Sequence, residues 1–137
     1  NYLGMMSDLM PKLAGIRRPG AAALDLAYVA AGFTDGFFES GLNPWDVAAG
    51  SLLVTEAGGL VGNFTGEADF LEQKECMAGN PRVYGQLVSV LGKYSKFASA
   101  GEKATLRQAP SAETVEVAEE AAPAATEEPS KSEDAPF

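Results

Sequence analysis

The chain of 137 residues contains no histidine and a single cysteine. Without histidine, neither a Ser-His-Asp triad nor a His-ligated zinc site can be built from this chain alone. One cysteine excludes an intrachain disulfide. Cys76 stands in an apolar run with Met77 and Ala78, where we expect it to be a small buried hydrophobic residue.

Long apolar runs and basic stripes are also missing. No apolar stretch approaches the roughly 20 residues that a membrane-spanning helix needs, and no signal peptide is visible at the first residues. We therefore expect no membrane partner and a cytoplasmic location. Lysine and arginine do not gather into a stripe, so we expect no direct nucleic-acid binding by this part of the protein.

Acidic charge is unevenly distributed. Residues 1–100 hold ten Asp and Glu against seven Lys and Arg, whereas residues 101–137 hold nine against three, which is a net of −6 out of −9. From about Ala98 onward the sequence is rich in Ala, Glu, Pro, Ser and Thr. Such a segment cannot bury enough apolar surface to offset the conformational entropy that it would lose on ordering. We predict a domain over residues 1–97 and a disordered acidic tail over 98–137. The tail would serve as a solvated tether or, alternatively, as a partner-binding arm.

Helical and extended patterns alternate along residues 1–97. Apolar residues at helical spacing predict helices, and short β-prone runs between turn residues predict strands. Strands alternating with helices indicate a layered α/β fold. The expected helices cover residues 2–13, 21–31, the run that starts at 44, and 81–97; the expected strands cover 16–18, 36–39, 59–63 and 75–78.

The run from Trp45 to Gly59 is the most informative segment. Pro44 suits a first helical position, and Asn43 before it is a plausible N-cap. Asp46 then falls in the first turn, near the positive end of the helix dipole, and Gly58 supplies a left-handed C-terminal stop. On these grounds alone, Asp46 is most simply a capping carboxylate.

The same run resembles the second signature of the inositol monophosphatase family of Mg²⁺-dependent phosphatases, W-D-x-A-A-G-x-L-L-V-x-E-A-G-G. Three other segments, residues 17–32, 35–39 and 78–81, resemble the corresponding parts of bacterial members at the spacing those members have. The resemblance covers about residues 1–97. It implies that these residues are the C-terminal half of the inositol monophosphatase/sugar phosphatase fold.

The resemblance assigns roles to two carboxylates. Asp46 matches an aspartate that binds Mg²⁺ and meets a substrate hydroxyl, and Glu39 matches a glutamate that contacts the inositol ring. The alternative for Glu39 is a solvated strand end. Hard carboxylate ligands suit Mg²⁺.

The resemblance also assigns substrate contacts to a short segment before the second expected helix. Gly20, Ala21 and Ala22 match residues whose backbone touches substrate, and Arg17 matches a basic residue near the site. Tiny side chains and the N–H groups at a helix start are suited to such contacts. Close helix packing is the alternative for the small residues, and a surface charge pair with Arg18 is the alternative for Arg17.

Two departures from the family are visible. Phe33 stands where bacterial relatives often carry a basic or small residue, so we expect a difference in substrate preference or in a local partner contact. The upstream glutamate and the D-P-I/L-D-G-T motif, which supply most metal ligands in the family, are absent from the sequence; Asp35-Gly36 is the nearest match. We therefore expect a C-terminal part of a longer enzyme that is inactive by itself.

For the whole enzyme, the resemblance implies Mg²⁺-dependent hydrolysis of a phosphate monoester, with inositol-1-phosphate as the foremost substrate, in a homodimer. Related phosphatases act on nucleotide 3′-phosphates, fructose bisphosphate or histidinol phosphate. Some bacterial relatives instead act as protein partners in ribosomal RNA transcription antitermination. Both alternatives stay open on the sequence.

Overall fold

The computed structural model describes residues 2–98, so the expected tail lies outside the described residues except for Ala98. The helices are α1 (Tyr2–Leu9), α2 (Ala22–Ala30), α3 (Pro44–Glu56), α4 (Phe70–Gln73) and α5 (Pro81–Leu91), and the 3₁₀ turns are η1 (Met10–Lys12) and η2 (Gly92–Tyr94). The strands are β1 (Gly36–Ser40), β2 (Leu60–Gly62) and β3 (Glu75–Gly79).

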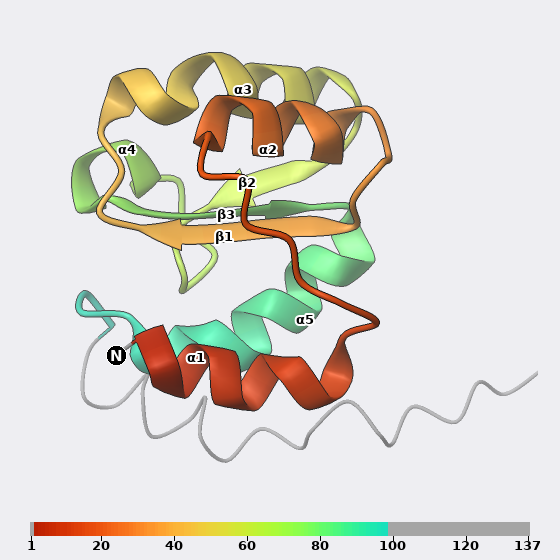
Figure 1. The fold of residues 1–137 in the computed structure, drawn as a ribbon. Coiled ribbons are helices and arrows are strands. Elements are labelled where there is room, and N and C mark those ends of the chain that lie inside the picture. The colour runs from red at the N-terminus through yellow and green to blue at the C-terminus, as the bar shows by residue number, and fades with distance from the viewer. Residues whose placement is uncertain (1, 99–137) are drawn as a thin grey trace, which may run out of the picture.

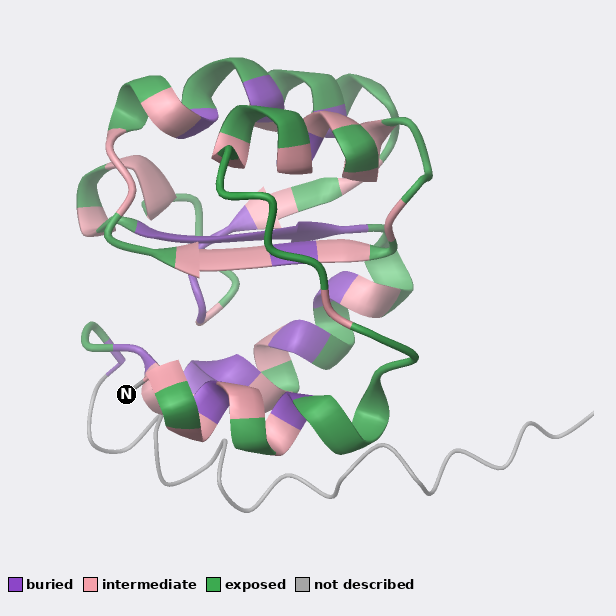
Figure 2. Cartoon of the chain, in the orientation of Figure 1, coloured by how far each residue is buried: buried purple, intermediate pink, exposed green. Residues whose placement is uncertain are grey.

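The strands form one antiparallel sheet in the order β1-β3-β2. Helices α2 and α3 cover one face of this sheet, and α1 and α5 lie on the other side (Figure 1). The expected layered α/β fold is therefore confirmed. Every residue of the central strand β3 is buried, as the continuous purple arrow in Figure 2 shows.

Alternation along the strands divides the core into two clusters, since successive side chains of a strand point to opposite faces. Toward α2 and α3, the buried residues are Leu26, Phe37, Val47, Val54, Cys76 and Ala78. Toward α1 and α5, they are Met5, Leu9, Phe64, Met77, Tyr84, Leu87 and Leu91. The prediction that Cys76 is buried is confirmed.

A glycine allows α2 and α3 to cross closely. A Cβ added to Gly50 would lie 2.6 Å from the Cβ of Leu26, which is shorter than side chains tolerate. Gly58, just beyond α3, has φ +85°, the left-handed conformation expected of a helix stop.

A buried carboxylate fixes the end of the described chain. Glu75 Oε2 accepts a hydrogen bond from the Ser95 hydroxyl at 2.7 Å, and Oε1 accepts from the Lys96 N–H at 2.9 Å. Both oxygens of this buried group are thereby paired, as burial of a charge requires.

Several sequence expectations are corrected. The helix expected over 2–13 ends at Leu9 and continues only as η1, because Pro11 disfavours the α conformation at the residue before it. Residues 16–18 form no strand; Pro19 lacks an N–H to donate to a ladder. The last helix ends at Leu91 rather than near Phe97, and the short helix α4 was not expected.

Within residues 2–98, no helix combines the length and the hydropathy that a bilayer crossing demands.

Candidate functional site

Three element ends lie on the same side of the α2–α3 layer. In Figure 1 the end of β1 and the start of α3 lie at the left of the molecule, and α2 begins nearer the middle and runs to the right. The segment that leads into α2 runs in front of β1 in the same view. Most of the residues that the resemblance singled out belong to these ends, so the fold gathers them in one region.

Asp46 lies in the first turn of α3 and is partly buried. Its Oδ2 accepts a hydrogen bond from the Asn43 N–H at 2.9 Å, so the carboxylate does cap the helix start. Among the described residues, no hydrogen bond to Oδ1 is found. Capping uses one oxygen and orients the group, so it is compatible with a ligand at the other oxygen.

Glu39 lies near the end of β1, opposite Cys76 on β3. Its Oε1 accepts a hydrogen bond from Arg18 Nη2 at 2.9 Å. The glutamate side chain is 17% exposed and that of Arg18 is 60% exposed, so the pair sits at the boundary between protein and solvent. Glu39 is therefore not the freely solvated strand end that was considered as an alternative.

The two adjacent arginines differ in their contacts. Arg18 reaches Glu39, whereas Arg17 donates from Nη1 to the carbonyl of its neighbour Ile16 at 3.0 Å and is exposed. The arginine that the resemblance singled out is thus not the one that joins Glu39 among the described residues. Which of the two would point inward could not be read from two consecutive arginines in a segment without periodicity.

Gly20, Ala21 and Ala22 form the approach to α2. Gly20 has φ +87°, in the left-handed region that favours glycine, and α2 begins at Ala22 after an extended Ala21. Ala21 has no side chain that could cap the first N–H groups, and no side-chain cap is present. An uncapped helix start lined by small residues is suited to bind an anion or a hydroxyl.

Asp25, in the first turn of α2, also belongs to this region, and the sequence did not single it out. Burial raises the pKa of the Asp25 carboxyl, the neighbouring Glu39 charge raises this pKa further, and Arg18 opposes both effects. Its proximity to Glu39 is a consequence of the fold, since fourteen positions separate the two in the sequence.

The carboxylates of this region meet only part of what a magnesium ion requires. Asp46 offers a hard oxygen ligand, the kind that Mg²⁺ prefers. Within residues 2–98, however, no group of three or more His, Cys, Asp or Glu side chains is arranged to hold a metal. The described residues therefore supply at most one part of such a site.

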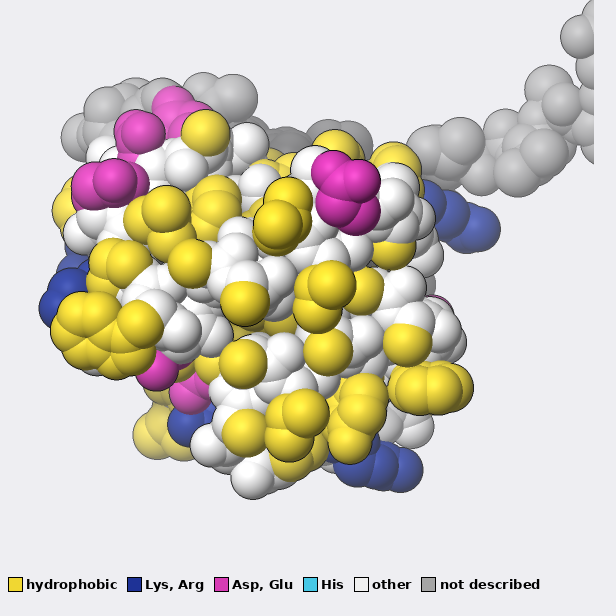
Figure 3. Space-filling view, turned by 90° about the horizontal axis from the view of Figure 1, so that it is seen from above, with side chains coloured by type: hydrophobic (Ala, Val, Ile, Leu, Met, Phe, Trp, Pro, Cys, Tyr) yellow, Lys and Arg dark blue, Asp and Glu magenta, His cyan; other side chains and the backbone are white. Residues whose placement is uncertain are grey.

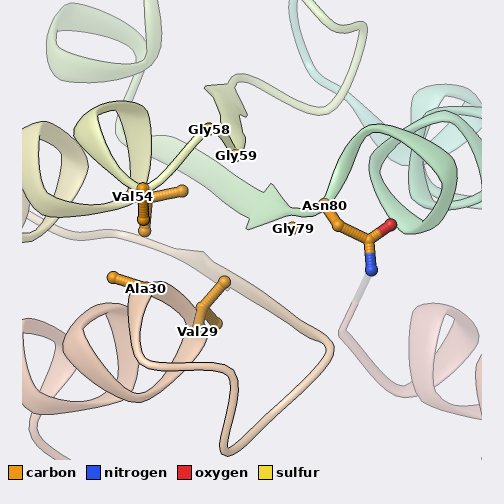
Figure 4. A pocket seen from close by; sticks show the side chains of 8 residues that line it. Val29, Ala30, Val54, Gly58, Gly59, Gly79 and Asn80 are labelled. Carbon is orange, nitrogen blue, oxygen red and sulfur yellow. The ribbon is translucent and has the colours of Figure 1, made fainter. Parts of the chain in front are cut away.

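A small cavity lies at the opposite end of the same helices (Figure 4). It has a volume of about 90 Å³ and is lined by Val29, Ala30, Val54, Ala57, Gly58, Gly59, Gly79 and Asn80. Asn80 is its only lining residue with a polar side chain, and the Oδ1 of that side chain accepts from the Val83 N–H. The cavity offers no charged group, so it is a packing gap rather than a reaction site.

The chain belongs to the inositol monophosphatase family, whose model matches residues 1–96. Among characterised relatives, it is 56% identical over 91 residues to Nus factor SuhB of Pseudomonas aeruginosa. It is 57% identical over 82 residues to Nus factor SuhB of Escherichia coli K12. These alignments cover 66% and 60% of this chain, but 34% and 31% of the relatives.

Solved structures give the same result for the fold. The extragenic suppressor protein suhB of Bartonella henselae matches with a TM-score of 0.65 and 49% identity, over 66% of this chain and 38% of that one. Inositol monophosphatase from Anabaena matches with a TM-score of 0.65 and 38% identity, over 68% and 37%. The chain thus spans about a third of the length of the relatives it matches.

Proposed function

We propose that the whole protein hydrolyses a phosphate monoester of a polyol with the help of Mg²⁺, and that inositol-1-phosphate is its foremost substrate. The observation that carries this proposal is that Asp46 of the family signature stands in the first turn of α3 and Glu39 near the end of β1, two element ends on the side of the molecule from which the uncapped helix α2 also starts.

The residues divide the work by their chemistry. Asp46 contributes one oxygen ligand to the metal and accepts a hydrogen bond from a substrate hydroxyl. Glu39 accepts hydrogen bonds from the polyol, and the backbone of Gly20, Ala21 and Ala22 approaches the substrate. Bound Mg²⁺ supplies Lewis-acid stabilisation of phosphate oxygens and activation of water. The remaining metal ligands come from parts of the protein other than residues 2–98.

The test is phosphate release by the full-length protein. Wild-type protein is assayed with inositol-1-phosphate, with a nucleotide 3′-phosphate and with fructose bisphosphate, each in Mg²⁺ and in EDTA. We expect Mg²⁺-dependent turnover with the highest kcat/KM for inositol-1-phosphate. Mg²⁺-dependent turnover that favours one of the other substrates would support phosphatase activity but contradict inositol-1-phosphate as the foremost substrate. No turnover of any substrate would contradict both proposals.

A second role, as a protein partner in transcription antitermination, is favoured by one comparison and one surface residue. Relatives at 56% and 57% identity are named Nus factor SuhB. Phe33, in the turn after α2, is 79% exposed and packs edge-on against Tyr28, so an aromatic side chain is presented to solvent.

The two roles are separable in one set of proteins. Pull-downs from lysate are made with the full-length protein and with a variant that lacks residues 98–137, and both are assayed for turnover. Recovery of RNA polymerase and transcription factors would support the partner role. If deletion abolishes recovery but leaves turnover unchanged, the two roles use different parts of the protein.

A further inference from the structure

Arg18 is joined to Glu39, the residue proposed to recognise the polyol. We propose that Arg18 is a positioning residue that orients the Glu39 carboxylate and so determines the preference for polyol phosphates. This inference rests on the proposed function of the site and adds a residue to which the family resemblance assigns no role.

The geometry fixes one oxygen of the carboxylate and leaves the other. Arg18 Nη2 and Glu39 Oε1 are 2.9 Å apart, within the range of a charge-assisted hydrogen bond. Among the described residues, no hydrogen bond to Glu39 Oε2 is found. A carboxylate held through one oxygen presents the other in a fixed direction, which is what recognition of a substrate hydroxyl requires.

Arg18 is itself held from a second side. Its Nη1 donates to the Tyr2 hydroxyl at 3.3 Å, and its guanidinium carbon lies 5.7 Å from the centre of the Tyr2 ring. That ring stacks on Phe38, the neighbour of Glu39 on β1, with 5.9 Å between ring centres. Arg18 is therefore linked to β1 twice, directly through Glu39 and indirectly through Tyr2, which stacks on Phe38.

The planar guanidinium is needed for this arrangement. It serves Tyr2 and Glu39 with two different nitrogens at a fixed angle, whereas a lysine has one nitrogen on a flexible chain. Lysine at position 18 would keep the charge beside Glu39 but lose the contact with Tyr2 or weaken both contacts. A conservative variant should therefore recover only part of the effect.

The positive charge of Arg18 also acts on a second carboxylate, that of Asp25. Beyond the effect of burial, the charge of Glu39 raises the pKa of Asp25, and the charge of Arg18 lowers it. Arg18 therefore offsets the repulsion between the two carboxylates. Without Arg18, the repulsion between the charges of Asp25 and Glu39 is no longer opposed by a cation, and we expect Glu39 to turn toward solvent.

The experiment compares two substrates in the full-length protein. Inositol-1-phosphate carries ring hydroxyls, and 4-nitrophenyl phosphate carries none. Arg18→Met should lower kcat/KM for inositol-1-phosphate about tenfold, equivalent to about 1.4 kcal/mol, with little change for the aryl phosphate. Arg18→Lys should recover part of the loss. Arg82→Met, a change of an exposed arginine on α5, is the matched control and should alter neither substrate.

A double-mutant cycle tests whether Arg18 acts through Glu39. If it does, Arg18→Met should cost little more in a Glu39→Gln background, since the partner is already altered. Equal losses on both substrates, or additive effects of the two changes, would overturn the inference and indicate a direct phosphate contact or a purely structural role. If wild-type protein turned over neither substrate, the proposed function itself would fail, and the role of Arg18 with it.

Discussion

The two helical layers on either side of the sheet are built differently. On α5, the buried residues Tyr84, Leu87 and Leu91 form one stripe, and the rest of the helix is mostly exposed, as expected of a helix covered on one side. On α2 and α3, large apolar side chains also face away from the sheet: Leu24, Tyr28, Leu52 and Leu53 are exposed. Figure 3, which views the molecule from above, shows hydrophobic side chains spread over this face.

The two layers therefore differ in how far packing on the sheet accounts for their sequences. Packing against the sheet and α1 accounts for the apolar residues of α5. Packing against the sheet accounts only for the inner faces of α2 and α3, because apolar residues on both faces are typical of a helix that is covered on both sides. The proposed site residues stand at the ends of this second layer, so packing and chemistry constrain it together.

The largest expected effect concerns Asp46. In the full-length protein, Asp46→Asn keeps the size of the side chain but removes its anionic oxygen. We expect Mg²⁺-dependent kcat to fall on the order of a hundredfold or more, while the weakened cap costs only about 0.5–2 kcal/mol of stability. Turnover and melting temperature are measured on one sample.

Glu56→Gln, at the other end of α3, removes a carboxylate from the same helix and serves as the control. It should leave kcat unchanged. Near-normal turnover of Asp46→Asn with a lowered melting temperature would reduce Asp46 to a helix cap.

The second prediction compares the two layers directly in the polypeptide of 137 residues. Leu91→Ala, in the fully buried stripe of α5, should lower the free energy of unfolding by about 2–5 kcal/mol. Leu53 lies on the outer face of α3 and is 51% exposed, so Leu53→Ala should change the free energy of unfolding by less than about 0.5 kcal/mol. Denaturant unfolding measures both. Equal losses would show that the outer face is not a free surface in that polypeptide.

How much of this architecture could be predicted depended on how local its causes are. The start of α3 at Pro44 and its end before Gly58 follow from residues inside the segment, and the sequence located both correctly. The coil at 16–18 could not be predicted from its composition, since a strand exists only if a neighbour pairs with it. The α/β layering followed from alternation along the chain, but the antiparallel order β1-β3-β2 did not.

The candidate site shows the same limit. Asp46 was singled out because the signature contains it, and Glu39 because the preceding segment 35–39 resembles the family; the roles of both remain predictions. The contacts of Arg18 with Glu39 and Tyr2 join residues 21 and 16 positions apart, and no local pattern encodes such a pairing. A family resemblance assigns roles to single positions in the sequence, whereas the contacts that orient those residues are visible only in the folded chain.

The third prediction concerns the close crossing of α2 and α3. Gly50→Ala places a methyl group against Leu26 and should cost about 1–3 kcal/mol, because a well-packed contact must open. Gly85→Ala, on α5, meets nothing within 4 Å and should stabilise the protein by about 0.5–1 kcal/mol through its higher helix propensity. Opposite signs in denaturant unfolding are expected; a stabilising Gly50→Ala would contradict the tight crossing.

The fourth prediction concerns the pH dependence that Cys76 gives to the α2–α3 side of the core. Burial, and secondarily the charge of Glu39, raises the pKa of the Cys76 thiol from 9.0 to about 12. Above pH 9, the unfolded chain loses this proton while the native protein keeps it, so the stabilisation is complete below pH 9 and is lost as the pH rises toward 12. Between pH 8 and pH 10, this group should lower the free energy of unfolding by about 1.3 kcal/mol. Cys76→Ala is less stable at pH 8 because of the cavity, but it lacks this slope. Tyrosine titration cancels in the difference between the two proteins, apart from the contribution of Cys76 to the raised pKa of Tyr84, which is secondary to burial. Parallel pH profiles of wild type and Cys76→Ala, or rapid alkylation of the native thiol at pH 8, would show that the thiol is not held neutral by burial.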